Sequence, residues 1–322
     1  SSSEPGSWSR GWYENVRADK EHMTTIDFLD ARARHLVENE VAIEQVATGF
    51  LFTEGPVWHD RDHVLVFSDI QGSTMYRWHA GAGITTFRKP SNMANGNAWD
   101  IEGRLLTCEH ATSCVTRTER DGRIIVIASH YQGKQFNSPN DIAVKGDGAI
   151  FFTDPDFGRR AAFGVLRDPE LPFRGVYRID PVTGETSLLV DDFEQPNGLC
   201  FSRDEALLYV NDTPRKHIRV FKVGERGALS DGRIFAETPG AEPGLPDGMK
   251  MDTEGNVYCT GPGGIHVFAP DGSPLFRIRT PEKTANFAFG DADYRTLYVT
   301  ACTSLYRLRV VIPGEPQMRA GG

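Results

Sequence analysis

Six short segments of this chain share one pattern, in which a polar residue stands just before a short apolar run. The polar lead residues are Glu54, Asn95, Asn140, Asn197, Asp247 and Asn286. Successive leads are 41, 45, 57, 50 and 39 positions apart. A degenerate repeat near this period is typical of the blades of a β-propeller. Equivalent points of the blades form a ring around the central channel, so we expect all six lead residues at one mouth of that channel.

From residue 41 onwards the chain is predicted to form strands and turns. Short runs rich in β-branched and aromatic residues, such as Val64–Ser68, are separated by Gly turns. No segment has a convincing helical period, which argues against alternating strand and helix units. Six repeats predict an all-β, six-bladed β-propeller with four strands in each blade. The last repeat, from Asn286, lacks one strand, and we expect Ile43–Thr48 to supply it and close the ring.

Residues 1–22 fit none of this pattern and are interpreted as a tail, either derived from cloning or natural and disordered. Residues 23–322 are then a single propeller domain, preceded by a lead-in over 23–42. Within the lead-in, residues 26–37 are consistent with a short amphipathic helix or an extended segment.

Composition narrows the class of protein. The 35 Lys and Arg against 44 Asp and Glu give a net charge of −9, and no basic run stands out, so nucleic acid and anionic membranes are poor partners. No run of 18 apolar residues predicts a membrane span. The five cysteines have no paired metal spacing and indicate buried free thiols in a reducing compartment. With no visible signal peptide, we expect a cytoplasmic monomer or homodimer.

The lead residues differ from ordinary turn residues because they occupy the equivalent position in successive repeats. Pro196-Asn197-Gly198 alone is a common turn sequence. Turn chemistry does not explain an acid at Glu54, which precedes Gly55-Pro56. Carboxylate and amide oxygens that converge at one channel mouth are the donors that a hard cation prefers. The alternative, polar channel residues bridged by water without a metal, stays open at this point.

Several longer motifs resemble the gluconolactonase, or senescence marker protein (regucalcin), family. The resemblance runs from about residue 41 to 310 and rests on Thr53-Glu54-Gly55-Pro56-Val57-Trp58, Asn137-Ser138-Pro139-Asn140-Asp141, Phe152-Thr153-Asp154-Pro155, Pro196-Asn197-Gly198-Leu199, Pro246-Asp247-Gly248-Met249 and Asn256-Val257-Tyr258. It implies a six-bladed propeller that holds one divalent cation in its channel and hydrolyses lactones. Some relatives hydrolyse organophosphorus fluoridates.

The resemblance also implies roles for individual residues. It places the metal on Glu54, Asn197 and Asp247, with Asn140 as a fourth ligand or a residue that faces the substrate. It makes Asp247 the catalytic base. The all-oxygen set favours Ca²⁺, with Zn²⁺, Mg²⁺ or Mn²⁺ possible.

Further polar residues are candidates for binding substrate. Asn95 is the second lead residue, and four others end or follow the second strand of a repeat: Glu109, His110, Asp154 and Asp212. The alternative for each acid is a structural hydrogen bond to a neighbouring turn.

The favoured function is a metal-dependent hydrolase that opens a lactone, with a sugar lactone such as glucono-1,5-lactone as the substrate. Two alternatives remain: phosphotriester hydrolysis with Asp247 as nucleophile, and a non-enzymatic calcium-binding propeller. The absence of a Gly-x-Ser-x-Gly motif disfavours a serine mechanism. The insertion Phe157–Phe173 is expected to select the lactone. Its Phe residues and Trp99 would favour an aromatic lactone if their loops cover the mouth, whereas pocket acids would favour a polyhydroxylated ring.

Overall fold

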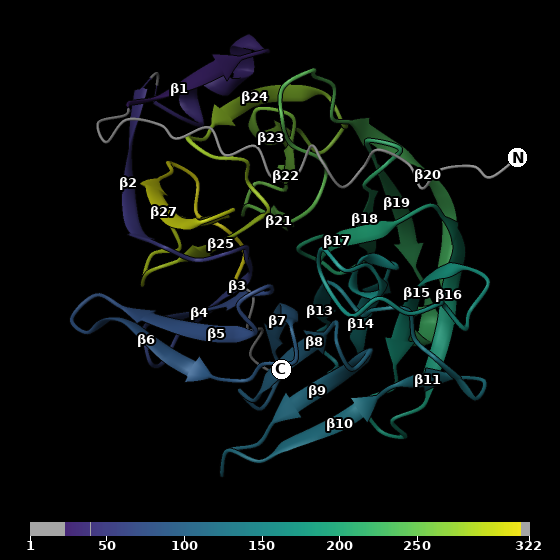
Figure 1. Ribbon diagram of the computed structural model, residues 1–322. Coiled ribbons are helices and arrows are strands. Elements are labelled where there is room, and N and C mark those ends of the chain that lie inside the picture. Colours follow the sequence, from purple (N-terminus) through teal and green to yellow (C-terminus); the bar gives the residue numbers. More distant parts are fainter. Residues whose placement is uncertain (1–22, 39, 317–322) are drawn as a thin grey trace, which may run out of the picture.

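A computed structural model describes residues 23–38 and 40–316. Six blades, each of four antiparallel strands, surround a central channel, which confirms the predicted propeller fold (Figure 1). The predicted tail, residues 1–22, lies outside the described residues. Within the described ranges, no helix has the length and apolar character needed to cross a membrane.

The blades follow one another along the chain, and each runs from an inner to an outer strand. The first three contain β3 (Thr53–His59), β4 (Val64–Asp69), β5 (Thr74–His79), β6 (Gly83–Arg88); β7 (Ala94–Trp99), β8 (Leu105–Glu109), β9 (Cys114–Thr118), β10 (Ile124–Ala128); and β13 (Ile142–Val144), β14 (Ile150–Asp154), β15 (Arg174–Ile179), β16 (Thr186–Phe193). The next two contain β17 (Pro196–Phe201), β18 (Leu207–Asp212), β19 (His217–Val223), β20 (Leu229–Glu237); and β21 (Met249–Met251), β22 (Val257–Gly261), β23 (Gly264–Phe268), β24 (Pro274–Arg279). Short elements outside the blades are the hairpin β11 (His130–Tyr131) and β12 (Lys134–Gln135), and the 3-10 turns η3 (Phe157–Arg159) and η4 (Glu225–Gly227).

The sixth blade combines both ends of the described chain. It contains β25 (Asn286–Gly290), β26 (Thr296–Ala301), β27 (Ser304–Arg309) and, as its outer strand, β2 (Glu40–Thr48). Strand β2 runs antiparallel to β27, with Ile43 opposite Leu308. The expected closure of the ring by Ile43–Thr48 is therefore confirmed.

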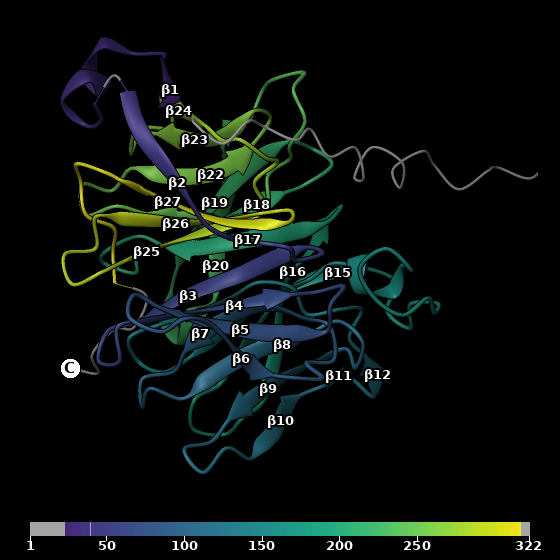
Figure 2. The same cartoon turned by 60° about the vertical axis from the view of Figure 1, so that its left-hand side comes forward.

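The lead-in also takes part in a sheet. Strand β1 (Met23–Phe28) pairs with the outer strand β24 of the fifth blade and with β2 of the sixth, so the two blades share one nine-stranded sheet. The 3-10 turn η2 (Ala31–His35) follows it. The Asp27 carboxylate accepts hydrogen bonds from Arg277 and Arg279 of β24. The segment expected to be a helix or extended is thus a strand followed by a short 3-10 turn (Figure 2).

Apolar side chains fill the spaces between neighbouring blades. Phe152 and Tyr177 stack with ring centroids 5.2 Å apart in the third blade, within a cluster that includes Leu106 and Val115 of the second. Trp58 of the first blade stacks on Tyr298 of the sixth at 5.5 Å. All five cysteines are buried and free, as predicted. Burial of apolar surface between blades is the main stabilising contribution to such a ring.

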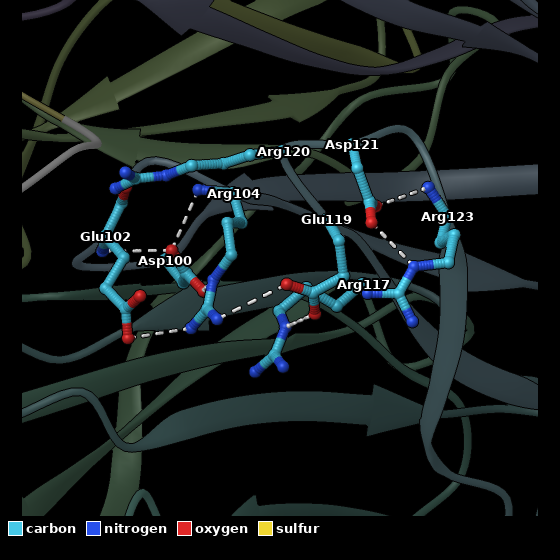
Figure 3. A network of polar contacts seen from close by, with 8 residues as sticks. All are labelled: Asp100, Glu102, Arg104, Arg117, Glu119, Arg120, Asp121 and Arg123. Atoms are coloured by element: carbon cyan, nitrogen blue, oxygen red, sulfur yellow. Dashed lines mark hydrogen bonds and ion pairs between the residues drawn. The ribbon is translucent and has the colours of Figure 1, made fainter.

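Ionic contacts join two turns of the second blade at the end away from its lead residue. Arg104 lies between Asp100 and Glu119, with its Nε 2.8 Å from Asp100 and its Nη1 3.5 Å from Glu119 (Figure 3). The eight residues of this network are four Arg and four acids, so their formal charges cancel. The side chains of Arg104 and Asp100 are 17% and 8% exposed, whereas those of Arg123 and Asp121 are 74% and 54% exposed, and a pair as exposed as the second contributes little to stability. We assign this network a local role in holding the turns.

Candidate functional site

The six lead residues form a closed ring. In four repeats a glycine follows the lead, and a Cβ added there would lie 1.9 to 2.4 Å from an atom of the next lead: Gly55 against Asn95, Gly96 against Asn140, Gly198 against Asp247, Gly248 against Asn286. At the fifth junction the Thr153 hydroxyl, from the strand paired with the Asn140 segment, donates to the Asn197 carbonyl. At the sixth, Asn286 donates to the Glu54 carboxylate over 3.0 Å. Glycine is needed where the backbones approach this closely.

A second repeated device fixes the loops that carry the leads. The acid that ends the second strand of a blade accepts hydrogen bonds from two consecutive backbone N–H groups, which lie two and three residues before the lead. The three examples are Asp69 with Leu51 and Phe52, Asp154 with Asn137 and Ser138, and Asp212 with Glu194 and Gln195. Burial raises the pKa of Asp154 to about 7 despite the two N–H donors.

Glu109 occupies the corresponding place in the second blade, but side chains surround it. It accepts from Arg88 at 2.6 Å and Asn92 at 2.9 Å, and also from Thr112 and Thr116. A pocket, called the mouth pocket below, lies among the lead residues, and the described residues that line it do not include Glu109, Asp154 or Asp212. These three acids hold loops in place rather than face the pocket.

The mouth pocket has one polar and one apolar side. Its polar side contains five of the six lead residues together with His110, and all six side chains are buried: Glu54, Asn95, Asn140, Asn197, Asp247 and His110. Its apolar side contains Phe52, Ile70, Phe157 and Phe163. The structure therefore brings together the four residues expected to bind metal, and adds Asn95 and His110 to them. The sixth lead, Asn286, lines the channel below.

Two carboxyl groups meet at the centre of this pocket. Those of Glu54 and Asp247 lie within hydrogen-bonding reach of each other. Burial, and then the charge of Asp141, raises the pKa of Glu54, while burial, and then the charge of Glu54, raises the pKa of Asp247. Buried acids this close need a shared proton or a cation, because like charges in a dry site repel.

Two amide side chains that line the pocket have an oxygen atom without a hydrogen-bond partner among the described residues. Asn197 donates through Nδ2 to the Thr213 hydroxyl at 3.1 Å, and that hydroxyl donates to the Pro246 carbonyl. The Oδ1 atoms of Asn197 and Asn95 are buried and have no hydrogen-bond partner among the described residues. Buried acceptors without partners are uncommon and indicate a ligand or water. Two carboxylates with unpartnered amide oxygens fit an oxygen-liganded divalent cation.

His110 connects the pocket to the insertion. Its Nδ1 donates to the Phe163 carbonyl at 2.8 Å, so its Nε2, 3.2 Å from Asn95 Nδ2, is the acceptor of that contact. Burial lowers the pKa of His110 to about 4, which keeps the ring neutral near pH 7. A neutral His110 is required for this pair of hydrogen bonds.

The insertion Phe157–Phe173 lies on the mouth side, since Phe157 and Phe163 line the pocket. Arg159 turns inward and donates to the backbone carbonyls of Phe136 and Asn137, so it anchors the loop rather than faces a ligand. Phe173 and Trp99 are not among the lining residues described. Phe52 and Ile70 also line the pocket, although the sequence pattern did not identify them. Each is adjacent to a residue of a motif, Phe52 to Thr53 and Ile70 to Asp69.

Comparison with known proteins adds to this geometry. Residues 52–303 match the family model described as SMP-30/Gluconolactonase/LRE-like region. A gluconolactonase of Zymomonas mobilis is 32% identical over 298 residues, which cover 85% of this chain and 83% of that protein. The pentonolactonase XacC of Haloferax volcanii is 27% identical, over 85% of this chain and 96% of that protein. A solved gluconolactonase structure from Xanthomonas campestris is 33% identical with a TM-score of 0.82, over 92% of this chain and 100% of that one.

Proposed function

We propose a mechanism of lactone hydrolysis at the channel mouth, on the premise that this chain belongs to the SMP-30/gluconolactonase/LRE-like family and is a lactonase. The substrate is a sugar lactone such as glucono-1,5-lactone, a choice supported by gluconolactonases at 32% and 33% identity. One observation carries the mechanism: the buried Glu54 and Asp247 side chains share a pocket with the unpartnered Oδ1 of Asn197.

One divalent cation is part of this proposal, and Glu54, Asn140, Asn197 and Asp247 would hold it. The set offers two carboxylates and two amides, all oxygen donors, which favours Ca²⁺ over Zn²⁺, Mg²⁺ or Mn²⁺. When bound, such a cation stabilises negative charge on a carbonyl oxygen and lowers the pKa of water.

Asp247 is the proposed general base. As the water oxygen bonds to the lactone carbonyl carbon, Asp247 takes one water proton, and it returns a proton to the ring oxygen when the ring C–O bond breaks. The product is a hydroxy acid. Asn211 Nδ2 donates to the Asp247 carbonyl at 2.6 Å and so fixes the backbone from which this carboxylate projects.

Glu54 is the proposed fixed negative charge of the site. Its Oε2 accepts from the Gly55 N–H at 2.5 Å and from Asn286 at 3.0 Å, which holds the carboxylate in one orientation. Asn95 Oδ1 is positioned to accept a hydrogen bond from a substrate hydroxyl, since His110 occupies the amide nitrogen of the same side chain.

The test combines calorimetry with proton release. Chelator-treated protein should lose hydrolysis of glucono-1,5-lactone, recover it with Ca²⁺, and bind one Ca²⁺ per chain by titration calorimetry. The Glu54→Gln variant should bind Ca²⁺ more weakly, whereas Glu102→Gln, on the opposite end of the second blade, should bind it normally. Unchanged hydrolysis by cation-free protein, with no Ca²⁺ binding, would contradict the proposal.

A further inference from the structure

We propose a further activity of the mouth pocket: hydrolysis of lactones that carry an alkyl or aryl substituent on the ring. This inference rests on the proposed lactone hydrolysis and extends it to a second class of substrate. The observations that carry it are a preformed apolar wall and a shortage of polar side chains able to bind substrate hydroxyls.

The apolar wall comes from three separate parts of the chain. Phe52 precedes β3, Ile70 follows β4, and Phe157 and Phe163 belong to the insertion. Phe52 and Ile70 are 7% and 1% exposed. Phe163 meets Phe52 edge to face with ring centroids 5.1 Å apart. An apolar substituent placed against these four side chains would leave water for an apolar surface.

Polar contacts hold this wall over the mouth. The Ala162 carbonyl accepts from Gln71 Nε2 at 2.9 Å, and the Phe163 carbonyl accepts from His110. Arg167 donates to the His110 carbonyl at 2.8 Å. Because the insertion is already docked, a ligand need not order it, and more of the contact free energy contributes to binding.

The polar side has little left for a polyhydroxylated ring. Apart from the four proposed cation ligands, the described polar lining side chains are Asn95 and His110. His110 uses both ring nitrogens, and Asn95 uses its Nδ2 on His110, which leaves Asn95 Oδ1. A substrate hydroxyl buried without a partner is unfavourable, so each further hydroxyl gains little here.

The experiment measures kcat/KM by proton release with the full chain loaded with Ca²⁺. The substrates are δ-valerolactone and δ-lactones with methyl, propyl, pentyl or phenyl groups on the carbon next to the ring oxygen. We expect kcat/KM to rise by about fourfold for each methylene buried, until the wall is covered. Phe163→Ala should lower kcat/KM for the pentyl lactone by about tenfold and for δ-valerolactone much less. Leu166→Ala, in the same loop but 77% exposed, is the matched control and should change neither.

A flat or falling series in an enzyme that hydrolyses glucono-1,5-lactone would overturn this inference and leave the proposed function standing. If no lactone is hydrolysed, the proposed function fails, and calorimetry with δ-valerolactam and its 6-pentyl derivative tests the wall alone. Tighter binding of the pentyl lactam, weakened by Phe163→Ala, would support apolar recognition. Equal affinities would refute it.

Discussion

Gly198 offers a test of how closely the ring must fit for Asp247 to act. A Cβ at this position would lie 1.9 Å from the Asp247 carbonyl oxygen and 2.9 Å from Asn211 Nδ2. Contacts below 3.0 Å essentially never occur for a real Cβ, so the Gly198 and Asp247 backbones must separate by about 1.1 Å. Asn211 donates to that carbonyl at 2.6 Å, so a shift of the Asp247 backbone also disturbs this hydrogen bond.

A displacement of about 1 Å in a catalytic group costs on the order of 10²-fold in rate. Overpacking of this kind also lowers the free energy of unfolding by about 1–3 kcal/mol. We therefore expect Gly198→Ala to reduce kcat/KM for glucono-1,5-lactone by about 10²-fold while the protein stays folded at 25 °C.

The assay is proton release during lactone opening, with thermal unfolding followed on the same samples. Gly81→Ala is the matched control, because a Cβ added at Gly81 would lie 3.5 Å from its nearest neighbour, His79, which is an ordinary contact. The control should keep its rate and its midpoint of unfolding. If Gly198→Ala turned over within twofold of the unaltered chain at an unchanged midpoint, the close approach would not position Asp247 and the reasoning would be wrong.

Three further predictions concern the same pocket. Asp247→Asn should lower kcat by about 10²-fold or more with an unchanged circular dichroism spectrum, since it removes the proposed base; near-normal turnover would place the base elsewhere. Thr213→Val should weaken Ca²⁺ binding by about 10–100-fold in calorimetry, because the amide of Asn197 loses the hydroxyl that orients it; equal affinity would argue against Asn197 as a ligand. The pKa of His110 is lowered to about 4 in the folded chain, so the unfolded chain takes up a proton first as pH falls. Stability should therefore decline between about pH 6.5 and 4, and less steeply in His110→Gln; parallel profiles from urea unfolding would contradict this.

The ring of lead residues was predictable because it depends on a period that recurs along the chain. Each repeat begins again with the inner strand of a blade, at the same distance from the channel axis. This brings Glu54 and Asp247 together, although they lie in different blades. The closing strand was predictable for a related reason, since a blade with an unpaired edge needs a fourth strand.

The acids at strand ends were harder to interpret. A carboxylate that lines a pocket and one that binds backbone N–H groups look alike in one sequence. Their offset was nevertheless informative: Asp154 and Asp212 stand 14 and 15 positions after their leads, and Asp69 stands 15 after Glu54. The acid that recurs 14 or 15 positions after the lead accepts the same pair of backbone N–H groups in each of three blades, so it serves the fold.

The contact between His110 and Phe163 could not be predicted in this way. It joins residues 53 positions apart through a backbone carbonyl of an insertion whose path has no repeat. The pairing of β1 with β24 is similar, because Asp27 shows no pattern that identifies Arg277 as its partner.

Closure of the sixth blade has a consequence for biosynthesis. Ile43 of β2 pairs with Leu308 of β27, which follows it by 265 positions. At about 5–20 residues per second, β2 would leave the ribosome on the order of 10–50 s before its partner strand exists. A pairing this distant also slows folding, because the loop must close before the contact forms. The nascent chain therefore carries an unpaired β2 edge through most of its synthesis. A chain whose synthesis ends within the last blade would have five blades and an open edge, and an open edge is prone to pair with other chains.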